Sequence, residues 1–456
     1  MERKSIFHTS VDLLNGPILQ SLLIFAVPLF ISNIFQQLYN TVDTMIVGNY
    51  LGDTSLAAIG SCSAIYDLFV GFALGIGNGL AIVTARSYGS GNQELLKKSV
   101  ACSMIIGIIS SLVITAIGII FLYPLLEILN TPELIINEAY SYIFYITLFV
   151  LVMFAYNLCA GLMRAIGNSV MPLIFLIVSS CFNVILDILF ITQFNMGVKG
   201  AAIATVIAQG ISVVLCIIYM FRKTKILIPE RKHFHYDKDL YKEMLGQGLS
   251  MGFMSSIVSC GSVILQYGIN SLDTLIIASH TVARKIYMFF NMPFTSMALA
   301  ISTYVSQNHG ANQSKRIRDG IFIAYIYDVI VALIITVTLI FGAKPLVQFI
   351  SGSTETVVIS NATTYLLVVG PFYAVLGILI QSRNALQGLG KKMLPLVSSV
   401  IELIGKIIFV IVFIPQFQYL AVIFCEPVIW VVMTLYLVYC LFKDPVMLAG
   451  KNIKKR

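Results

Sequence analysis

Residues 18–48 read ILQSLLIFAVPLFISNIFQQLYNTVDTMIVG, a run long enough to cross a bilayer, which needs about 20 mostly apolar residues. The run carries a single acidic residue, Asp43, near its carboxyl end. A carboxylate facing the hydrocarbon costs on the order of 3 kcal/mol, so Asp43 must face protein or water. The stretch therefore predicts a membrane-spanning helix with an ionisable group on its protected side.

The composition of the whole chain indicates an integral membrane protein. Of its 456 residues, 58% are hydrophobic and 11% are charged, and the mean hydropathy is +0.91. No cleavable signal peptide is apparent, because the first apolar run is itself long enough to span. We expect an all-α fold with spans at about 18–48, 54–83, 96–123, 138–163, 170–192, 199–221, 242–270, 274–305, 317–342, 357–386, 393–414 and 419–442.

The sequence contains an internal duplication. ARSYGSGNQELLKK (85–98) follows the second span, and SQNHGANQSKRIR (306–318) follows the eighth. RAIGNSVMP (164–172) precedes the fifth span, and QGLGKKMLP (387–395) precedes the eleventh. Each half has an even number of spans and enters the membrane from the same side. The twelve helices are thus predicted to form two six-helix lobes, a parallel repeat with a pseudo-two-fold axis along the membrane normal.

Basic residues set the predicted topology and the domain limits. Most of the 29 Lys and Arg fall on one side of the membrane if the amino terminus is cytoplasmic, so the net charge of +8 reflects topology and not nucleic-acid binding. We expect both termini in the cytoplasm of a cell-membrane protein. The predicted parts are a first lobe (1–221), a basic linker (222–241), a second lobe (242–442) and a basic tail (443–456).

Other residue groups are better explained by packing or solvation than by chemistry. The eight cysteines lie within spans and lack metal-ligand spacing, so no disulfide or metal site is expected. GFALGIGNGL (71–80) favours close helix packing through Gly71 and Gly75 over phosphate binding. HFH (233–235) is expected to be solvated, and His280 to lie at the interface. Pro28 should kink the first span and free a carbonyl.

A polar stripe lies along the first span. Gln36, Tyr39, Asn40 and Asp43 stand at i, i+3, i+4 and i+7, so they share one helical face. The fifth span, SSCFNVILDILFI (179–191), has a similar stripe, and so does the sixth, GVKGAAIATVIAQGIS (197–212). These two stripes consist of Ser180, Asn183 and Asp187, and of Thr205, Gln209 and Ser212.

The expected depth of each residue in the membrane places the polar groups of the three spans close together. At about 1.5 Å per residue, Asp43, Asp187 and Thr205 lie within one helical turn of the same level in the outer half of the membrane. Two carboxylates, an amide and a hydroxyl suit a hard cation such as sodium. Two neighbouring carboxylates in a poorly solvated site can equally hold a proton. The residues thus leave both coupling ions open, and packing by hydrogen bonds is the structural alternative.

The second half departs from this pattern. Asn183 maps onto Lys406, and Asp187 maps onto Val410. Glu402 and Lys406 stand at i, i+4 and are expected to form an internal ion pair. Glu426 is expected either to neutralise the same lysine or to face a cavity, and Gln266 lies near the counterpart of Asp43. Asp67 and Asp328 are intramembrane carboxylates without a matching stripe.

The order, spacing and duplication of these motifs resemble the multidrug and toxic compound extrusion (MATE) family over nearly the whole chain. The resemblance rests on the first-span VPLFISNIFQQLYNTVDTMIVGNYLG, on GSGNQ and HGANQ, on RAIGNSVMP, and on FNVILDILFI followed by GVKGAAIAT. It implies export of organic cations or drugs in exchange for sodium or protons. It also implies a coupling site at Asp43, Asn183, Asp187 and Thr205, with Gln36 and Tyr39 beside it.

We therefore expect a monomeric secondary antiporter for small, cationic organic substrates, with no cofactor other than the coupling ion. The polar residues expected along its substrate cleft are Gln36, Tyr39, Asn40, Gln266, Glu402 and Glu426. A lipid-linked precursor flippase is the alternative, but its cavity would be strongly cationic. An enzyme or receptor is disfavoured, because the chain contains no nucleophile with a base, no HExxH-type site and no nucleotide loop.

Overall fold

The computed structural model describes residues 10–129, 131–352 and 355–452, and no strand occurs among them. The first half contains α1 (Ile18–Leu51), α2 (Asp53–Ser61), α3 (Ser63–Gly89), α4 (Gln93–Ile128), α5 (Glu133–Leu148), α6 (Val150–Ala165), α7 (Val170–Ile188), η1 (Leu189–Gln193), α8 (Val198–Lys223), η2 (Lys225–Leu227) and η3 (Arg231–Phe234). The second half contains α9 (Lys238–Asn270), α10 (Thr274–Gly310), α11 (Ser314–Ser351), α12 (Thr356–Val369), η4 (Gly370–Phe372), α13 (Tyr373–Gly388), α14 (Met393–Ile408), η5 (Phe409–Phe413), α15 (Ile414–Phe417), α16 (Tyr419–Phe442) and α17 (Pro445–Asn452).

These helices account for the predicted spans. In the described residues, ten helical segments are each long and apolar enough to cross a membrane. The pair α5 and α6, bent by 48°, makes an eleventh. The remaining predicted span corresponds to α10, which is long enough but more polar. The fourth span is thus a broken helix, a feature that the uninterrupted apolar run did not indicate.

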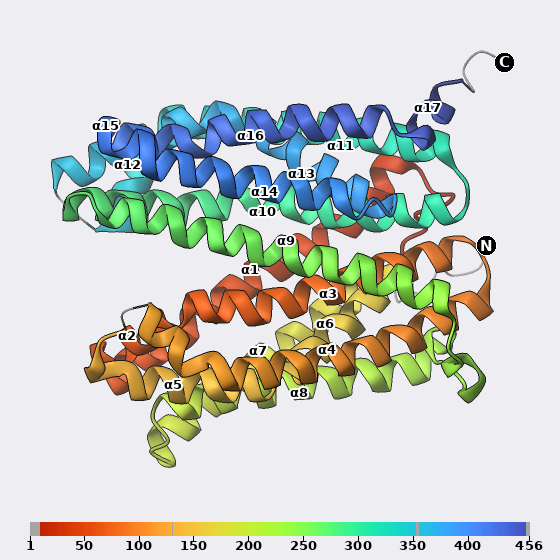
Figure 1. The fold of residues 1–456 in the computed structure, drawn as a ribbon, viewed down its shortest axis with the longest axis horizontal. Helices are drawn as coiled ribbons and strands as arrows, with labels where there is room; N and C mark the ends of the chain where they lie inside the picture. Colours follow the sequence, from red (N-terminus) through yellow and green to blue (C-terminus); the bar gives the residue numbers. More distant parts are fainter. Residues whose placement is uncertain (1–9, 130, 353–354, 453–456) are drawn as a thin grey trace, which may run out of the picture. The chain divides into compact units, whose positions relative to one another are not determined.

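Packing divides the chain into two compact units. The first comprises the described residues up to Gly16 together with residues 24–256, and the second comprises residues 17–23 and those from 257 onward. The division falls within α1 and α9, so each of these helices contributes to both units. In each unit the long helices run along one another (Figure 1).

The repeated motifs form the turns between helices. Gly91 in GSGNQ has φ 71°, and the equivalent position in HGANQ is Asn312 with φ 57°. Gly167 and Gly390 likewise have φ 87° and 77°. Left-handed backbone favours glycine and tolerates asparagine, which explains why these positions recur in the two halves.

A π-helical turn recurs at the same place in both halves. In the first half, η1 continues α7 just after Asp187. In the second half, η5 continues α14 just after Lys406. Such turns insert an extra residue into a helix and often occur at functional sites. The backbone of the two halves is therefore similar even around Asp187 and its counterpart in the second half, where the side chains differ.

Close packing within the first unit confirms the structural interpretation of the glycine-rich stretch. A Cβ at Gly75 would lie 2.6 Å from the carbonyl oxygen of Met251 in α9, and one at Gly79 would lie 2.7 Å from that of Gln247. Only glycine permits this approach. Gly71 is looser, because the nearest atom to its Cβ position is Ser255 Oγ at 3.2 Å.

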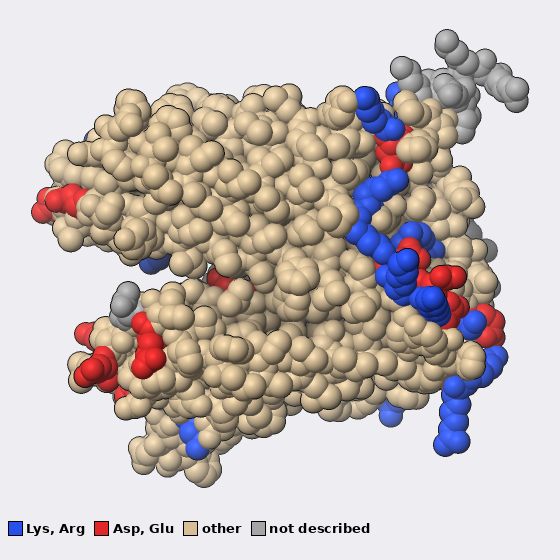
Figure 2. All heavy atoms as spheres, in the orientation of Figure 1, with Lys and Arg blue, Asp and Glu red and all other residues tan. Residues whose placement is uncertain are grey.

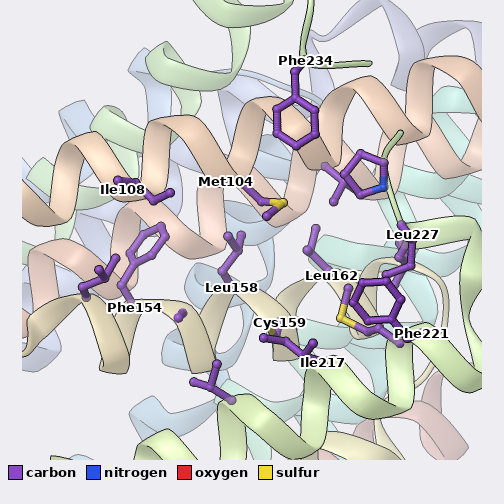
Figure 3. Close-up of a pocket in the computed structure, with 17 residues that line it drawn as sticks. Met104, Ile108, Phe154, Leu158, Cys159, Leu162, Ile217, Phe221, Leu227 and Phe234 are labelled. Atoms are coloured by element: carbon purple, nitrogen blue, oxygen red, sulfur yellow. The ribbon is translucent and has the colours of Figure 1, made fainter. Parts of the chain in front are cut away.

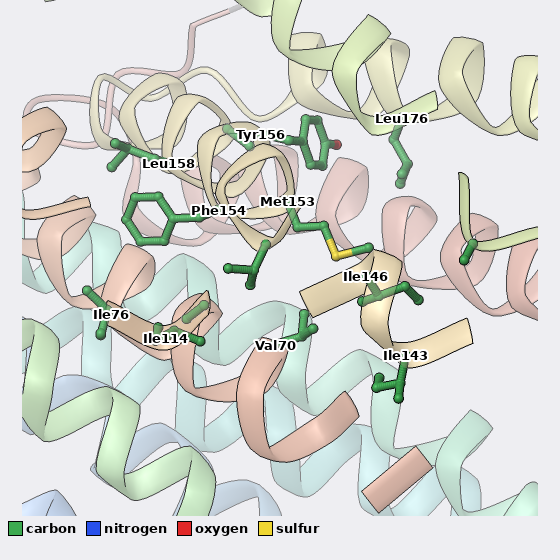
Figure 4. Close-up of a cluster of buried hydrophobic side chains, with 14 of the residues drawn as sticks. Val70, Ile76, Ile114, Ile143, Ile146, Met153, Phe154, Tyr156, Leu158 and Leu176 are labelled. Atoms are coloured by element: carbon green, nitrogen blue, oxygen red, sulfur yellow. The ribbon is translucent and has the colours of Figure 1, made fainter. Parts of the chain in front are cut away.

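Apolar side chains from α3 to α8 fill the interior of the first unit. The residues labelled in Figure 4 point toward one another from α3, α4, α5, α6 and α7, with Met153 and Ile146 near the centre. In a bilayer these contacts stabilise through van der Waals packing, because the lipid is as apolar as the interior. This packing holds the polar stripes at fixed depths.

The linker after α8 is bound to the first unit by ionic contacts. Lys97 pairs with Glu230 at 2.7 Å, and Lys232 pairs with Glu94 at 2.9 Å. His233 is buried: its Nδ1 accepts from the Glu230 backbone N–H at 2.8 Å, and its Nε2 contacts Glu94 Oε2 at 2.9 Å. The prediction that His233 is solvated is wrong, because folding of η3 brings it against α4. His235 is exposed, as expected.

Candidate functional site

The α1 stripe divides into buried and exposed members. Tyr39 and Asp43 are half-buried, whereas Gln36 and Asn40 are exposed. The Tyr39 hydroxyl donates to Thr205 Oγ1 in α8 at 3.3 Å. This bond connects the first and sixth spans at the level that depth counting predicted.

The α7 residues of the predicted site are fully buried. Asn183 and Asp187 have no exposed surface, and Thr205 is 8% exposed. In the amide orientation that satisfies both of its polar atoms, Asn183 donates to Asp187 Oδ2 at 2.8 Å. Its oxygen then accepts from the Thr205 backbone N–H at 3.3 Å. The amide thus fixes the position of the Asp187 carboxylate relative to α8.

The two carboxyl groups of the site lie within hydrogen-bonding range of each other. Each also keeps one buried oxygen without a partner: Oδ1 of Asp43 and Oδ1 of Asp187. Buried polar atoms are normally paired, since leaving one unsatisfied costs about 1–3 kcal/mol. An unpaired oxygen on each of two neighbouring carboxyl groups is available to a hard cation or to a proton.

A cavity of about 190 Å³ opens onto Asp43, one member of this carboxyl pair. Tyr39, Asn40, Asp43 and Thr205 line it, whereas Gln36 of the same α1 stripe does not. Further lining residues come from α2, α3 and α5: Ile59, Ser63, Tyr66, Asp67, Tyr142 and Ile146. Asn183 and Asp187 lie behind the lining. In the part of the chain that the structure describes, no group of three His, Cys, Asp or Glu side chains could hold a metal.

None of the further lining residues was assigned to a site from the sequence, and three of them, Asp67, Tyr66 and Tyr142, carry a carboxyl or phenol group. Asp67 was a visible signal, because it is an intramembrane carboxylate, but nothing in its own helix indicated its partners. Tyr66 and Tyr142 were two among 22 tyrosines and had no distinguishing spacing. Their place beside Asp43 depends on how α3 and α5 are rotated in the folded unit.

The second unit contains a paired ionic network at the corresponding place. Lys406, 3% exposed, pairs with Glu402 at 2.9 Å, which confirms the predicted internal ion pair. Glu402 also contacts Arg383 at 3.5 Å. Gln266, the counterpart of Asp43, is exposed and donates to Asn270 Oδ1 at 2.7 Å within its own helix.

Glu426 has a different partner from the expected one. Its Oε2 pairs with Arg284 Nη1 at 2.7 Å and accepts from the Tyr365 hydroxyl at 3.3 Å. The facing helix α10 thus supplies the ion-pair partner of Glu426, which the sequence did not indicate, while the charge of Lys406 also acts on Glu426. That Glu426 faces a cavity stays a prediction. The Arg284 guanidinium also lies 4.4 Å from the centre of the Tyr287 ring.

Two further predictions concern isolated residues of the spans. His280 is 5% exposed and packs edge-on against the rings of Tyr365 in α12 and Tyr419 in α16. Its position at the membrane interface stays a prediction. Pro28 lies inside the unbroken helix α1, and its carbonyl accepts from Ser32 Oγ at 2.8 Å. The kink and its role stay predictions.

A helical membrane protein with duplicated halves and with two adjoining carboxylates inside one of them belongs to the class of multi-pass transporters. The MatE family model matches residues 28–189 and again residues 251–412, at the same separation as Gly167 and Gly390. The chain belongs to this family. The two-lobe, twelve-span fold and the assignment to drug efflux by antiport, with no enzymatic activity, are thereby confirmed.

Similar proteins support this assignment. The chain is 30% identical to the probable multidrug resistance protein YoeA of Bacillus subtilis (strain 168), over 70% of this chain and 71% of that protein. It is 24% identical to an FAD transporter of Shewanella oneidensis, over 86% and 87% of the two chains. A crystal structure described as MATE in the bent conformation superposes with a TM-score of 0.86 at 20% identity, covering 98% of this chain and 99% of that one.

Proposed function

We propose that this efflux transporter couples export to cation entry at the carboxyl pair of its first unit. The observation that carries the proposal is the pair of buried, unpartnered oxygens on Asp43 and Asp187. With Asn183 and Thr205 they offer carboxylate, amide and hydroxyl groups to a proton or to sodium. The ion is transported cargo, and inward movement of one charge supplies about 2.3 kcal/mol per 100 mV.

The geometry also suggests how ion binding affects the fold. Tyr39 and Asp43 belong to α1, whereas Asp187 and Thr205 belong to α7 and α8. Two ionised carboxylates in contact repel each other, and a cation between them removes that repulsion. Ion binding therefore favours conformations in which α1 stays against α7 and α8, and ion release favours the others.

The substrates are small organic compounds, and we propose that they are cationic. Asp43 and Asp67 give the cavity carboxylates without a basic residue among its lining. A flavin nucleotide such as the compound named for the Shewanella relative carries phosphates, which these carboxylates would repel. We further propose that the protein lies in the cell membrane with both termini in the cytoplasm, on the basis of the basic-residue distribution. We also propose that it functions as a monomer, since the carboxyl site is built within one unit of a single chain.

The test uses full-length protein in proteoliposomes with a sodium gradient and a pH gradient imposed separately. Ethidium serves as the cationic probe and flavin mononucleotide as the anionic one. We expect ethidium export to respond to one gradient, and Asp43→Asn to lose that response. Asp53→Asn, an exposed acidic residue at the start of α2, is the matched control and should behave like the wild type.

Undiminished ion-driven export by Asp43→Asn would overturn the coupling site. Export of flavin mononucleotide in place of ethidium would overturn the cationic substrate class while leaving the coupling site intact. A response to only one gradient identifies the ion.

A further inference from the structure

The first unit contains a second cavity, separate from the carboxyl site. Its volume is about 360 Å³, within the range of roughly 300–1,000 Å³ typical of small-molecule sites. It lies between α4, α6, α8 and the linker, and its lining is almost entirely apolar. Figure 3 shows Met104, Leu158, Leu162, Phe221 and Leu227 around the open space.

The cavity is a groove with a buried floor and an exposed rim. Leu158, Leu162 and Leu227 on the floor are at most 6% exposed. Ile217 and Phe221 on the rim are 42% and 57% exposed. The groove is therefore open at the surface of the unit, where a membrane-spanning helix bundle contacts lipid. Lipid that only touches the outer surface of a helix would not reach the groove floor.

The length of the groove matches one leaflet. Its α6 lining runs from Leu151 to Leu162, which is about 16 Å at 1.5 Å per residue. This is roughly half of the ~30 Å hydrocarbon thickness of a bilayer. An acyl chain of a single leaflet therefore fits the groove along its length.

Basic residues adjoin one end of the groove. Arg222 directly follows the rim residue Phe221, and Lys223 and Lys225 precede Leu227 in the linker. All three side chains are exposed, and no acidic partner is found for them among the described residues. Within the first unit, Figure 2 shows Lys and Arg gathered at the end where the linker lies, with uncharged side chains along the length of the helices. An apolar groove beside unpaired cations complements an anionic lipid.

The linker wall of the groove is held in place independently of any ligand. The Lys97–Glu230 and Lys232–Glu94 pairs attach the segment that carries Pro229 and Phe234 to α4. The Lys97 ammonium holds the pKa of Glu230 below its usual range, so the Glu230 carboxylate stays ionised at neutral pH. The groove is thus preformed, which lowers the entropic cost of binding.

We propose that this groove binds one anionic phospholipid from the leaflet at the basic end of the unit. One acyl chain lies between α4, α6 and α8, and the headgroup phosphate contacts Arg222 and Lys225. The site is distinct from the ion-coupling residues, and the proposal does not depend on which ion or substrate is transported.

The test is native mass spectrometry of delipidated full-length protein, titrated with phosphatidylglycerol and with phosphatidylcholine of the same acyl chains. We expect one tightly bound phosphatidylglycerol and about tenfold weaker binding of phosphatidylcholine. Both lipids have the phosphate, but the choline ammonium makes phosphatidylcholine net neutral, and attraction of a net anionic lipid by Arg222 and Lys225 contributes about this factor. Ala155→Phe places a ring in the groove and should abolish tight binding. Ala116→Phe, the same change at an exposed α4 position outside the groove, should not.

A second pair of variants tests the headgroup contact. Arg222→Gln with Lys225→Gln should remove the preference for phosphatidylglycerol. Lys238→Gln with Lys242→Gln removes the same charge from exposed positions of α9 and should retain the preference. If Ala155→Phe does not fold, Cys159→Phe fills the same groove. Equal binding of the two lipids, or wild-type binding by the groove-filling variant, would overturn the proposal.

Discussion

The two units use one scaffold but differ at the same position of the repeat. In the first unit, α7 presents Asn183 and Asp187 toward α1, and buried oxygens remain open. In the second unit, the equivalent residues of α14 and η5 are Lys406 and Val410. They pack against α9, where Cβ atoms at Gly261 and Gly268 would lie 3.1 Å and 2.9 Å from them.

This difference shows how a duplicated fold can separate two roles. The first unit leaves carboxylate oxygens unpaired beside a cavity, at a cost in stability that ion binding can offset. The second unit fills the equivalent space with side chains and pairs the charges there internally, through Glu402–Lys406 and Arg284–Glu426. Another buried carboxylate of this unit, Asp328, lies elsewhere in the unit and also keeps one oxygen, Oδ2, without a partner. We infer that the second network is structural and that ion coupling belongs to the first unit.

The largest expected effect is on ion-driven export, and it should distinguish a buried carboxylate of the first unit from one of the second. Asp187→Asn should weaken ion-driven export by about tenfold or more, because an ionised ligand is worth at least ~1.4 kcal/mol of ion affinity. Asp328→Asn is the matched change in the second unit, where Gln381 donates to Asp328 Oδ1 at 3.2 Å and the amide can keep that bond. Its ion-driven export should equal that of the wild type.

Equal losses in Asp187→Asn and Asp328→Asn would contradict the separation of roles. Both variants are measured in the same proteoliposome assay, with protein amounts normalised by a folded-state melting profile. Loss of export in Asp328→Asn alone would move the coupling site to the second unit.

An effect of intermediate size is expected on the free energy of unfolding, with no effect on ion coupling. Glu426→Gln leaves Arg284 without its charge partner. We expect a loss of about 2 kcal/mol of unfolding free energy, below the ~3–5 kcal/mol of fully buried pairs because the Arg284 side chain is 32% exposed. Thermal melting checks the stability, and the ion dependence of export should keep its wild-type midpoint. A shift in the midpoint of the ion dependence would show that the second unit takes part in ion coupling.

The smallest expected effect concerns the bond that connects α1 to α8. Tyr39→Phe removes a neutral hydrogen bond of 3.3 Å to Thr205, which is worth about 0.7 kcal/mol, so apparent ion affinity should fall by about threefold. Tyr50→Phe changes an exposed tyrosine of the same helix and serves as the control. A loss as large as that of Asp187→Asn would make Tyr39 a principal ligand in place of a positioning residue.

Much of this molecule follows from local sequence patterns. Span positions follow from apolar length, and the repeat follows from turns that need left-handed backbone at Gly91, Gly167 and Gly390. The i, i+3, i+4, i+7 spacing and helix depth were enough to bring Asp43, Asp187 and Thr205 together, since both depend only on helical geometry. The break between α5 and α6 had no such signal, because the sequence on both sides of Phe149 is apolar.

The sequence by itself determined a twelve-span duplicated membrane protein with a polar stripe on its first helix. Only the tertiary structure decided which residues face each other across helices: Asp67, Tyr66 and Tyr142 around Asp43, Arg284 opposite Glu426, and the groove beside the linker. The physical reason is that periodicity fixes which side chains share a face of one helix. The rotation of each helix against its neighbours comes from packing by residues far apart in the chain.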